Sequence, residues 1–400
     1  GIFPVTTGFR VIGNFQSLDQ GITAPFLLKD GFPGTLSPNP VISPSILNGQ
    51  NVTSRSGTVG TMPRTQNWSL SLQRSLGTNW AMEVSYVANK NTRQTQSGLI
   101  NENQVDPRYL ALGSLLTQNI NSAAAIAAGI QRPYPSFTGS VNQALRAYPQ
   151  YLNITEQSAK AGANFYNAFT ARIRQRYTNG FTFDAHYTFS RNIGYSGSLQ
   201  NNFNRQLEYG LLAFDIPHSM VVNYTYELPF GPGKRFANST GWTSKLVGGW
   251  SVNGIQRYQS GAPLNVVINN TLPIFNRTLR PDVVSGVDLT TGIANGDFNA
   301  NSDRLINRDA FRNPAPFSFG NAALSYNSLR NFATLGEDFS LIKNTRVGER
   351  VSIETSAQFI NALNRHRFTD INANFTNPTF GQASGSNIGR IITLNLKVKF

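Results

Sequence analysis

The segment ITLNLKVKF, residues 392–400, alternates apolar and polar side chains without interruption and closes on an aromatic residue. Strict alternation is the period of a β-strand that has one apolar and one polar face. Leu394, Leu396 and Val398 would share one face of this strand, and Asn395 and Lys397 would share the other. One such run can arise by chance in a chain of 400 residues, so its weight depends on repetition.

The same pattern recurs along the chain. It is unbroken in FTFDAHYTFS (181–190) and in VSIETSAQF (351–359). It has one exception each in MVVNYTYEL (220–228), WSLSLQRSL (68–76) and WAMEVSYVA (80–88). These runs have about 9 to 11 residues, the length that a tilted strand needs to cross a bilayer. The repeated unit is therefore a two-faced strand of membrane length.

Composition narrows the classes of protein. No run approaches 18 consecutive apolar residues, which excludes transmembrane helices, and a mean hydropathy of −0.27 is compatible with strands that alternate. The 35 Gly and 20 Pro indicate long turn-rich connections, and the absence of Cys excludes disulfides and thiolate metal sites. The net charge of +14 is spread along the chain, which favours a basic lumen and basic loops facing lipopolysaccharide phosphates over nucleic-acid binding. No cofactor is expected.

The order of strands and gaps predicts an antiparallel transmembrane β-barrel. Strands are expected at 67–76, 80–88, 166–177, 181–191, 219–228, 250–259, 337–344, 350–360 and 390–400, and a tenth is an option within 262–269. Gaps between them alternate short and long, as in bacterial outer-membrane barrels with short periplasmic turns and long extracellular loops. We therefore expect a loop-rich extracellular segment over 1–66 and, over 67–400, the C-terminal barrel portion of about 9–10 strands. This sheet is expected to be incomplete and curved, or to close directly between its first and last strands.

The alternation predicts which side chains face lipid and which face the lumen. Phe183, Tyr187, Tyr224, Ile353 and Leu396 are predicted to face lipid. Asp184, His186, Glu354 and Lys397 are predicted to face the lumen. A slip of one residue would reverse every assignment.

Aromatic side chains are predicted to form two belts at the membrane interfaces, where amphipathic rings concentrate. The periplasmic belt would contain Trp80, Tyr177, Phe181, Trp250 and Phe400. The outer belt would contain Trp68, Tyr86, Tyr166, Phe189, Tyr258 and Phe359. As the end of an exposed amphipathic strand, Phe400 is also the candidate signal for the barrel-assembly machinery.

Several short motifs in order along the chain resemble the barrel of Oar-like TonB-dependent receptors, which carry a carboxypeptidase-regulatory-like domain. The motifs are QNWSLSLQRSL (66–76), EVSYV (83–87), YPQY (148–151), YTFSR (187–191), DIPHS (215–219), YELPFG (226–231), GGW (248–250), QSGAP (259–263), FINALN (359–364) and PTFG (378–381). The resemblance runs from about residue 60 to the end and covers the C-terminal part of such a barrel. It implies an outer-membrane receptor whose plug and TonB-contacting segments lie outside these residues, so coupling to TonB is implied only through a plug that this sequence does not contain.

Charged residues on the predicted lumen face are the candidate ligand contacts. Arg172, Arg174 and Arg176 alternate along one strand, and they would contact an anionic ligand or a plug, or pair with Asp184 or Glu354. His186 is expected among them as one more lumen residue. His186, His218 and His366 have no metal-ligand spacing and form no catalytic pattern, so no enzymatic activity is expected.

The segment DFNANSD (297–303) places oxygen-bearing side chains at alternate positions, as at the start of a calcium loop. Its candidate ligands are Asp297, Asn299, Asn301 and Asp303. Ser302 stands where the loop requires Gly, and Arg308 stands where a bidentate Glu is required. A polar surface loop is therefore the preferred interpretation.

Two functions remain open from the sequence. The first is a receptor or transporter barrel in the bacterial outer membrane that binds a bulky ligand through its extracellular loops. The alternative is a passive pore or a structural surface barrel without energy coupling. In both cases the direct partners are outer-membrane lipid and lipopolysaccharide, and the ligand cannot be identified from the residues.

Overall fold

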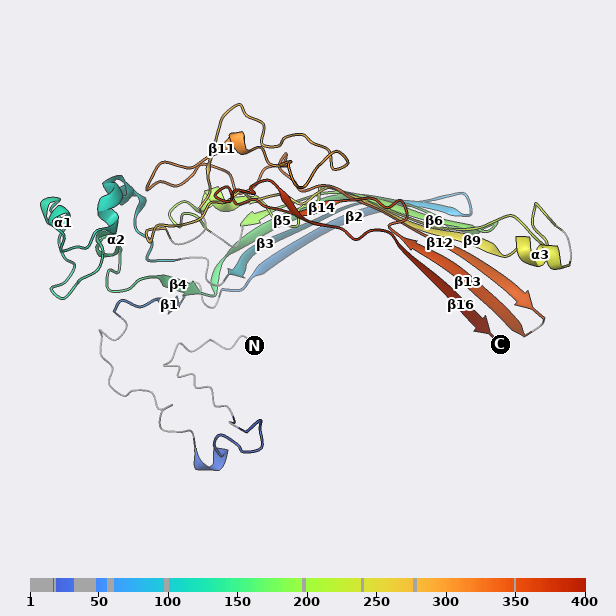
Figure 1. The fold of residues 1–400 in the computed structure, drawn as a ribbon, viewed down its shortest axis with the longest axis horizontal. Helices are drawn as coiled ribbons and strands as arrows, with labels where there is room; N and C mark the ends of the chain where they lie inside the picture. Colours follow the sequence, from blue (N-terminus) through green and yellow to red (C-terminus); the bar gives the residue numbers. More distant parts are fainter. Residues whose placement is uncertain are drawn as a thin grey trace.

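Nine long strands form one antiparallel sheet in the computed structural model, which describes residues 17, 19–31, 48–55, 61–96, 101–195, 199–238, 241–275, 279–348 and 350–400. Each strand pairs with its neighbours in the chain, as the alternation of short and long gaps predicts (Figure 1). In sheet order the strands are β2 (Arg64–Leu76), β3 (Trp80–Gln96), β5 (Ala159–Thr178), β6 (Phe181–Tyr195), β8 (His218–Glu227), β9 (Trp250–Gln259), β12 (Thr334–Val347), β13 (Val351–Ile360) and β16 (Ile391–Lys399). The all-β antiparallel prediction is confirmed, and the sheet is open, with β2 and β16 as its edges.

Short elements decorate this sheet. The short strands are β1 (Val52–Arg55), β4 (Ile154–Gln157), β7 (Tyr209–Leu211), β10 (Asp282–Val283), β11 (Phe311–Arg312), β14 (Phe368–Ile371) and β15 (Ala383–Ser386). The α-helices are α1 (Ala123–Ala127), α2 (Val141–Ala144) and α3 (Trp242–Val247). In the described residues, 3-10 segments span Leu28–Asp30, Pro107–Thr117, Arg205–Glu208 and Arg308–Ala310. Within the described part of the chain, no helix is long and apolar enough to cross a membrane.

Several strands run further than the alternation predicts. β5 has 20 residues, β3 has 17 and β6 has 15, all beyond the expected membrane length. The ladder continues through polar pairs such as Asn91–Asn164 and Asn164–Gly194. Hydrogen bonds between main chains do not require an apolar face, so pairing persists where the sequence pattern has ended.

The optional tenth strand at 262–269 is absent. Only isolated bridges occur there, at Pro263, Val267 and Ile268. The backbone of this segment pairs with loops instead: the amide of Leu264 donates to the carbonyl of Leu329, and that of Val267 donates to Ala373. Pro263 also lacks the amide that a strand interior requires.

The predicted domain boundary at residue 66 stays a prediction. β2 begins at Arg64, and β1 pairs in parallel with β4 of a later loop. The predictions for residues 1–16, 18, 32–47 and 56–60 lie outside the described residues. An extracellular position for the segment 1–66 stays a prediction.

The register separates the two faces as the alternation requires. Phe183 lies opposite Tyr224, and Asp184 lies opposite Asn223, so each pair shares a face. Following the pairs across the sheet places Phe183, Tyr187, Tyr224, Ile353 and Leu396 on one face, and Asp184, His186, Glu354 and Lys397 on the other.

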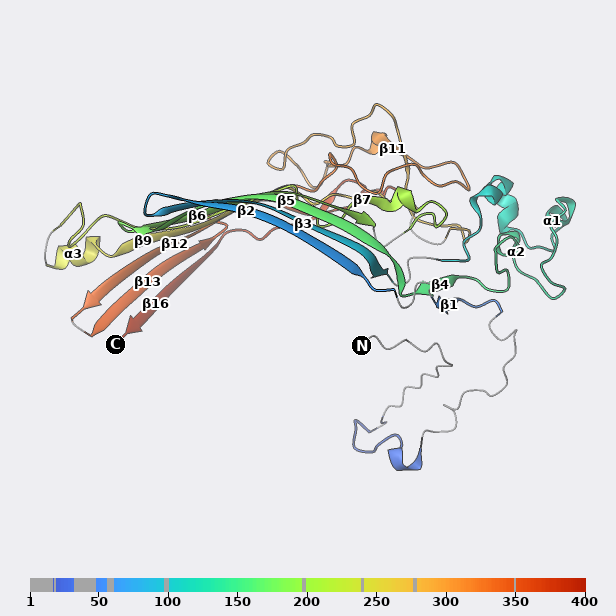
Figure 2. The ribbon, with the colours of Figure 1, turned by 180° about the vertical axis from the view of Figure 1, so that it is seen from behind.

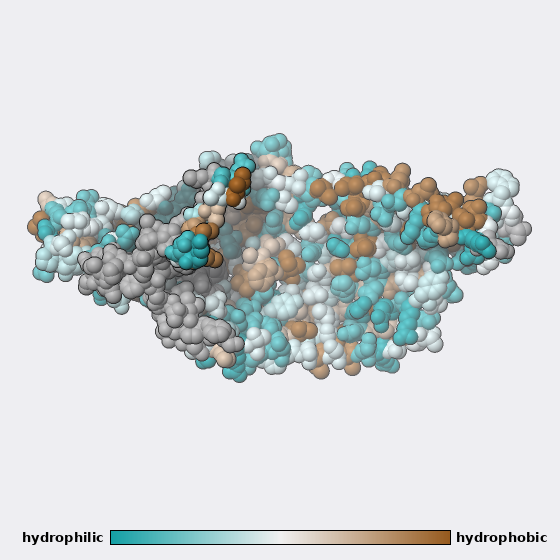
Figure 3. Space-filling model, turned by 90° about the horizontal axis from the view of Figure 1, so that it is seen from below, coloured by the Kyte–Doolittle hydropathy of each residue, from teal (hydrophilic) through white to brown (hydrophobic). Residues whose placement is uncertain are grey.

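Within the part of the chain that the structure describes, no protein layer covers much of the apolar face. Leu70, Leu72 and Leu394 are 75%, 70% and 78% exposed, respectively. In the view from below, hydrophobic residues gather on the half of the molecule that carries α3 and the C-terminus (Figure 3). An apolar surface of this extent is stable only in an apolar medium, so this is the lipid-facing surface of the sheet.

The long connections pack together at the other end of the sheet. We call segments 101–158, 199–217, 260–333 and 361–390 the loop layer (Figure 2). Three of them supply one hydrophobic cluster, whose largest fully buried members are Val105, Leu116, Ile120, Phe137, Val141, Ile274, Ile306, Leu329 and Phe380. Burial of aliphatic and aromatic side chains gives these loops a core of their own.

Asn103 organises one of these loops. Its side-chain amide nitrogen lies 2.9–3.0 Å from the carbonyl oxygens of Tyr148, Tyr151 and Leu152, and its amide oxygen accepts from the Tyr148 backbone. Asn103→Ala should cost about 1–3 kcal/mol of local stability, because buried backbone groups lose their partners. Hydrogen exchange at residues 148–152 would measure this loss. The matched control Asn121→Ala changes an exposed loop asparagine, and equal exchange in both variants would contradict the assignment.

Candidate functional site

The polar face of the sheet carries an ion pair on neighbouring strands. Arg172 of β5 donates to the carboxylate of Asp184 of β6, with Nε 3.1 Å and Nη2 2.5 Å from Oδ2. Arg172 lies directly opposite His186 on one side and Glu83 on the other. The structure therefore brings together Arg172, Asp184 and His186, which the sequence singled out.

These side chains line an open hollow of about 520 Å³ together with Glu83, Thr170, Thr188 and Asn223. Arg174 and Arg176 line a second hollow of about 520 Å³ nearer the turns, beside Asp184 and Asn223. The first hollow is lined by polar side chains on the face opposite the lipid-facing surface, whereas Phe183, Tyr224 and Ile255 also line the second. A role for the three arginines in contacting ligand or plug stays a proposal.

Glu354 lies apart from this group. It forms an ion pair with Lys399 of β16 at 2.7 Å. The expectation that the arginines could pair with Glu354 is wrong, because β6, β8, β9 and β12 separate β5 from β13. At a strand spacing of about 4.8 Å, five steps across the sheet amount to roughly 24 Å.

The predicted aromatics of the periplasmic belt lie at or near strand ends, whereas Tyr86, Tyr166 and Phe189 of the outer belt lie inside β3, β5 and β6. Trp80, Phe181 and Trp250 are the first residues of β3, β6 and β9, and the hydroxyl of Tyr177 donates to Glu227 at 2.7 Å. Tyr86, Phe169 and Phe189 form one row across β3, β5 and β6. The other members of the outer belt are Trp68, Tyr166, Tyr258 and Phe359. Their contact with lipid headgroups, and recognition of the fully exposed Phe400 by assembly machinery, stay predictions.

The candidate calcium loop is held together by its own hydrogen bonds. The Asp303 carboxylate accepts from the Asn299 amide and the Ser302 hydroxyl, both at 2.9 Å, and Asn299 Oδ1 accepts from the Asn301 amide. Two of the four candidate ligands thus use their oxygens to shape the turn. In the described residues, no group of three or more acidic, His or Cys side chains could hold a metal ion.

Three ion pairs with buried carboxylates fasten the loop layer. Arg280 Nη1 lies 2.6 Å from Glu208 Oε2, and these side chains are 6% and 0% exposed. Arg330 binds Asp215 at 2.6 Å, and Arg365 binds Glu337 at 2.8 Å. The Glu208 and Asp215 pairs each join the connection before β8 to the connection before β12. Buried carboxylates of this kind are strongly destabilising when their partner is lost.

Arg146 shows the same use of buried charge within a single loop. Its guanidinium donates to the carbonyl oxygen of Leu152 and reaches Asn153 Oδ1 at 3.4 Å. Burial lowers the pKa of Arg146 to about 10. The side chain therefore remains charged at neutral pH and holds two parts of its loop together.

A large cavity lies in the loop layer beside the start of β12, where Leu335 also lines it. It has a volume of about 780 Å³, and its aromatic wall is made of Phe298, Phe332 and Phe368. Phe298 stands 5.1 Å from the ring centroids of both other phenylalanines. The remaining charged lining is basic: Arg330 and Arg365, whose charges are paired, and Arg367. Such a cavity fits a ligand with an apolar body and an anionic group.

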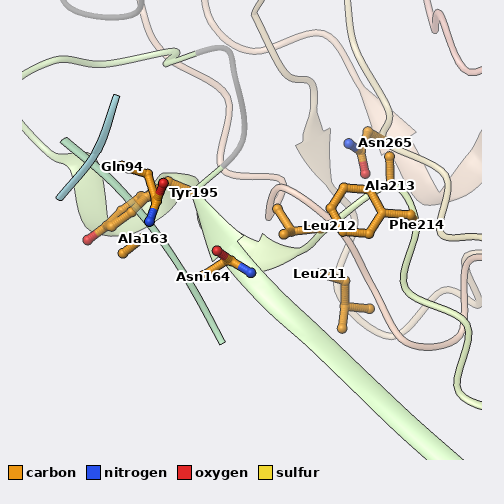
Figure 4. Close-up of a pocket in the computed structure, with 10 residues that line it drawn as sticks. Gln94, Ala163, Asn164, Tyr195, Leu211, Leu212, Ala213, Phe214 and Asn265 are labelled. Atoms are coloured by element: carbon orange, nitrogen blue, oxygen red, sulfur yellow. The ribbon is translucent and has the colours of Figure 1, made fainter. Parts of the chain in front are cut away.

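A smaller cavity of about 330 Å³ lies where the loop layer meets β5 and β6. Gln94, Asn164 and Tyr195 approach it from the strands, and Leu212, Phe214 and Asn265 approach it from the loops (Figure 4). Arg205 lies over the Tyr195 ring at 4.9 Å. This cavity therefore lies at the boundary between the sheet and the loop layer.

The sequence alone did not reveal the buried ion pairs or the 780 Å³ cavity. Some of the motifs quoted above nevertheless contain residues that hold the loop layer together. Asp215 begins DIPHS, and Gly261 lies in QSGAP, where an added Cβ would stand 1.7 Å from the carbonyl oxygen of Asn331. Phe380 and Gly381 close PTFG, with Phe380 fully buried and Gly381 at φ +82°. These motifs therefore mark loop packing.

Comparison with known proteins identifies the family. Residues 3–393 match the outer membrane beta-barrel domain family. This chain belongs to that family, and its place is the bacterial outer membrane. No curated protein matches the sequence.

Three solved structures illustrate the similarity of fold. The outer membrane transporter YddB from Escherichia coli is 12% identical, with a TM-score of 0.41 over 88% of this chain and 34% of its own. The FrpB iron transporter from Neisseria meningitidis is 11% identical, with a TM-score of 0.37 over 86% and 32%. The ferripyoverdine receptor of Pseudomonas aeruginosa is 11% identical, with a TM-score of 0.39 over 84% and 27%. The chain spans about a third or less of the length of each.

Proposed function

We propose that this chain is the C-terminal barrel portion of an Oar-like TonB-dependent receptor that binds a bulky ligand through its extracellular loops. The observation that carries the proposal is the loop layer, which has its own hydrophobic core, buried ion pairs and a cavity of about 780 Å³. A barrel that only conducts solutes does not require loops fastened to one another in this way. The motifs shared with the Oar-like family support the same interpretation.

The chemistry of the cavity narrows the ligand class. Phe298, Phe332 and Phe368 offer an apolar surface, and Arg367 adds a positive charge at the same wall. The ligand would therefore combine apolar or aromatic surface with an anionic group. Coupling to TonB would require a plug domain outside these residues, and Arg172, Arg174 and Arg176 are the candidates to contact it.

Liposome swelling distinguishes the proposed receptor from the alternative, a passive pore or structural surface barrel. The full-length protein is reconstituted and arabinose is used as the permeating probe. A receptor with a folded loop layer and plug should give swelling close to that of protein-free liposomes. Rapid arabinose-driven swelling would contradict the receptor proposal and favour the passive pore.

Binding provides the second measurement. Compounds retained from culture supernatant by the full-length protein are identified by mass spectrometry and compared with those retained by Phe332→Ala/Arg367→Ala. The double variant should retain at least tenfold less of the compound than the wild-type protein does. The matched control is Tyr226→Ala/Arg346→Ala, which removes an aromatic and a basic side chain from the sheet. Equal retention by both double variants would exclude the cavity as the binding site.

A further inference from the structure

The connection between β8 and β9 carries apolar side chains at the turn end of the sheet, far from the loop layer. Trp242 and Leu246 of α3 are 73% and 59% exposed, and Val247, Phe230 and Phe236 are also exposed. Figure 1 shows α3 at the end of the molecule opposite α1 and α2. Exposure of this apolar patch to water would cost free energy, which indicates that an apolar partner or medium covers it.

The attachment of α3 decides which side of the barrel wall it lies on. Lys343 of β12 donates from Nζ to the carbonyl oxygens of Lys245 and Leu246 at 2.8 Å and of Gly248 at 2.9 Å. Trp250 Nε1 donates to Leu246 at 3.1 Å, and the Lys343 ammonium lies 4.8 Å from the Trp250 ring centroid. The C-terminal end of α3 is therefore fixed to this lysine and tryptophan.

Lys343 and Trp250 lie opposite each other in the register, on the same face as Leu341 and Val252. This is the lipid-facing surface of the sheet. Because short turns lie at the periplasmic side of such barrels, α3 is held against the outer wall at the periplasmic rim. Its exposed side chains extend the lipid-facing surface past Trp250, the first residue of β9.

The residues that follow α3 are also closely packed. An added Cβ on Gly249 would lie 2.1 Å from the Asn344 carbonyl oxygen, and one on Gly231 would lie 2.6 Å from Gly248 Cα. The Leu228 amide donates to the Trp250 carbonyl, and the Asn344 amide donates to the Gly249 carbonyl. Residues 248–250, which follow the helix, are thus held by close backbone contacts with β12 and with residues 228–231.

Charge points to one kind of partner. Residues 228–249 contain Lys234, Arg235 and Lys245 and no acidic residue. Lys234 is paired with Glu227 of β8 at 2.8 Å, and Arg235 lies over the Phe236 ring at 5.3 Å. A segment with exposed tryptophan and leucine beside basic side chains matches the interfacial region of an anionic phospholipid leaflet.

We propose that residues 229–238 and 241–249 form an interfacial anchor that inserts Trp242 and Leu246 into the periplasmic leaflet and binds anionic phospholipid headgroups through Lys245 and Arg235. The anchor would fix the height of the barrel wall in the membrane at β8 and β9. This proposal is independent of the receptor function, because a passive barrel would use the same anchor.

Residues 1–400 contain no cysteine, which allows single spin labels to test the insertion. Leu246→Cys and Trp242→Cys are labelled in the full-length protein, any other cysteine replaced, after reconstitution into phosphatidylcholine–phosphatidylglycerol vesicles. Asn121→Cys in the loop layer is the aqueous control, and Leu394→Cys on the lipid-facing surface is the membrane control. Retained heat-modifiability confirms that each variant is folded.

Collisions with oxygen and with a water-soluble nickel chelate report the depth of each label. The oxygen-to-nickel accessibility ratio at 242 and 246 should exceed that at 121 several-fold and approach that at 394. A ratio equal to that at 121, or low accessibility to both reagents as expected in a protein–protein contact, would overturn the anchor.

The charge component has its own comparison. In phosphatidylcholine alone, or in Arg235→Gln/Lys245→Gln, the label at 246 should shift toward the aqueous value by at least twofold in the same ratio. An unchanged ratio in both tests would overturn the recognition of anionic headgroups.

Discussion

Glu208→Gln should loosen the loop layer by about 3–5 kcal/mol, because it leaves the guanidinium of Arg280 buried without a counter-charge. Glu208 is fully buried, and its other carboxylate oxygen accepts from the Gln200 amide at 2.9 Å. Gln200 in turn binds the Gly320 carbonyl and the Arg280 amide. The substitution therefore weakens a network that joins segments 199–217 and 260–333.

Limited proteolysis of the protein in intact cells would measure this effect, since the loop layer is expected to face the outside of the cell. Cleavage within 260–333 should accelerate by at least 100-fold in Glu208→Gln. The matched control is Glu354→Gln, which removes the carboxylate of the exposed pair with Lys399 and should leave cleavage unchanged. Equal cleavage rates in wild type and Glu208→Gln would show that the pair does not hold the loops.

Val222→Arg should impair insertion of the barrel, whereas the neighbouring Asn223→Arg should be tolerated. Val222 lies mid-strand on the lipid-facing surface, opposite Ala185 and Gln256. An arginine on that surface costs about 2–4 kcal/mol near the bilayer midplane. Asn223 lies on the opposite face beside Asp184, where an added positive charge meets a carboxylate.

Outer-membrane fractionation and heat-modifiability gels would measure the amount of folded barrel for both variants. The two substitutions add the same side chain at adjacent positions, so a difference between them reports the face and not the strand. If Asn223→Arg were the more damaging change, the assignment of faces would be reversed.

The sequence determined the sheet well. Alternation within 181–190, 351–359 and 392–400 places side chains on two faces, and the observed register keeps these faces across the sheet. Among the described residues, irregularities occur only beyond Asn91 in the β3–β5 ladder and beyond Gln175 in the β5–β6 ladder. The physical reason is that side chains alternate between the two faces of a strand, so a strand with lipid on one side needs an apolar side chain at every second position. The pattern can therefore be recognised within the sequence of each strand. The extension of β3, β5 and β6 was missed because polar flanks pair through the main chain alone.

The tertiary structure decided the loop layer and the position of α3. Glu208 and Arg280 are 72 residues apart, and Asp215 and Arg330 are 115 residues apart. Lys343 lies about a hundred residues from the helix whose carbonyl groups it binds. No local period records such contacts, because the free energy of a buried ion pair or of a helix held against a strand depends on where distant segments meet in space. The sequence by itself thus determined a two-faced membrane sheet, and only the tertiary structure decided how its loops close over one end and what anchors the other.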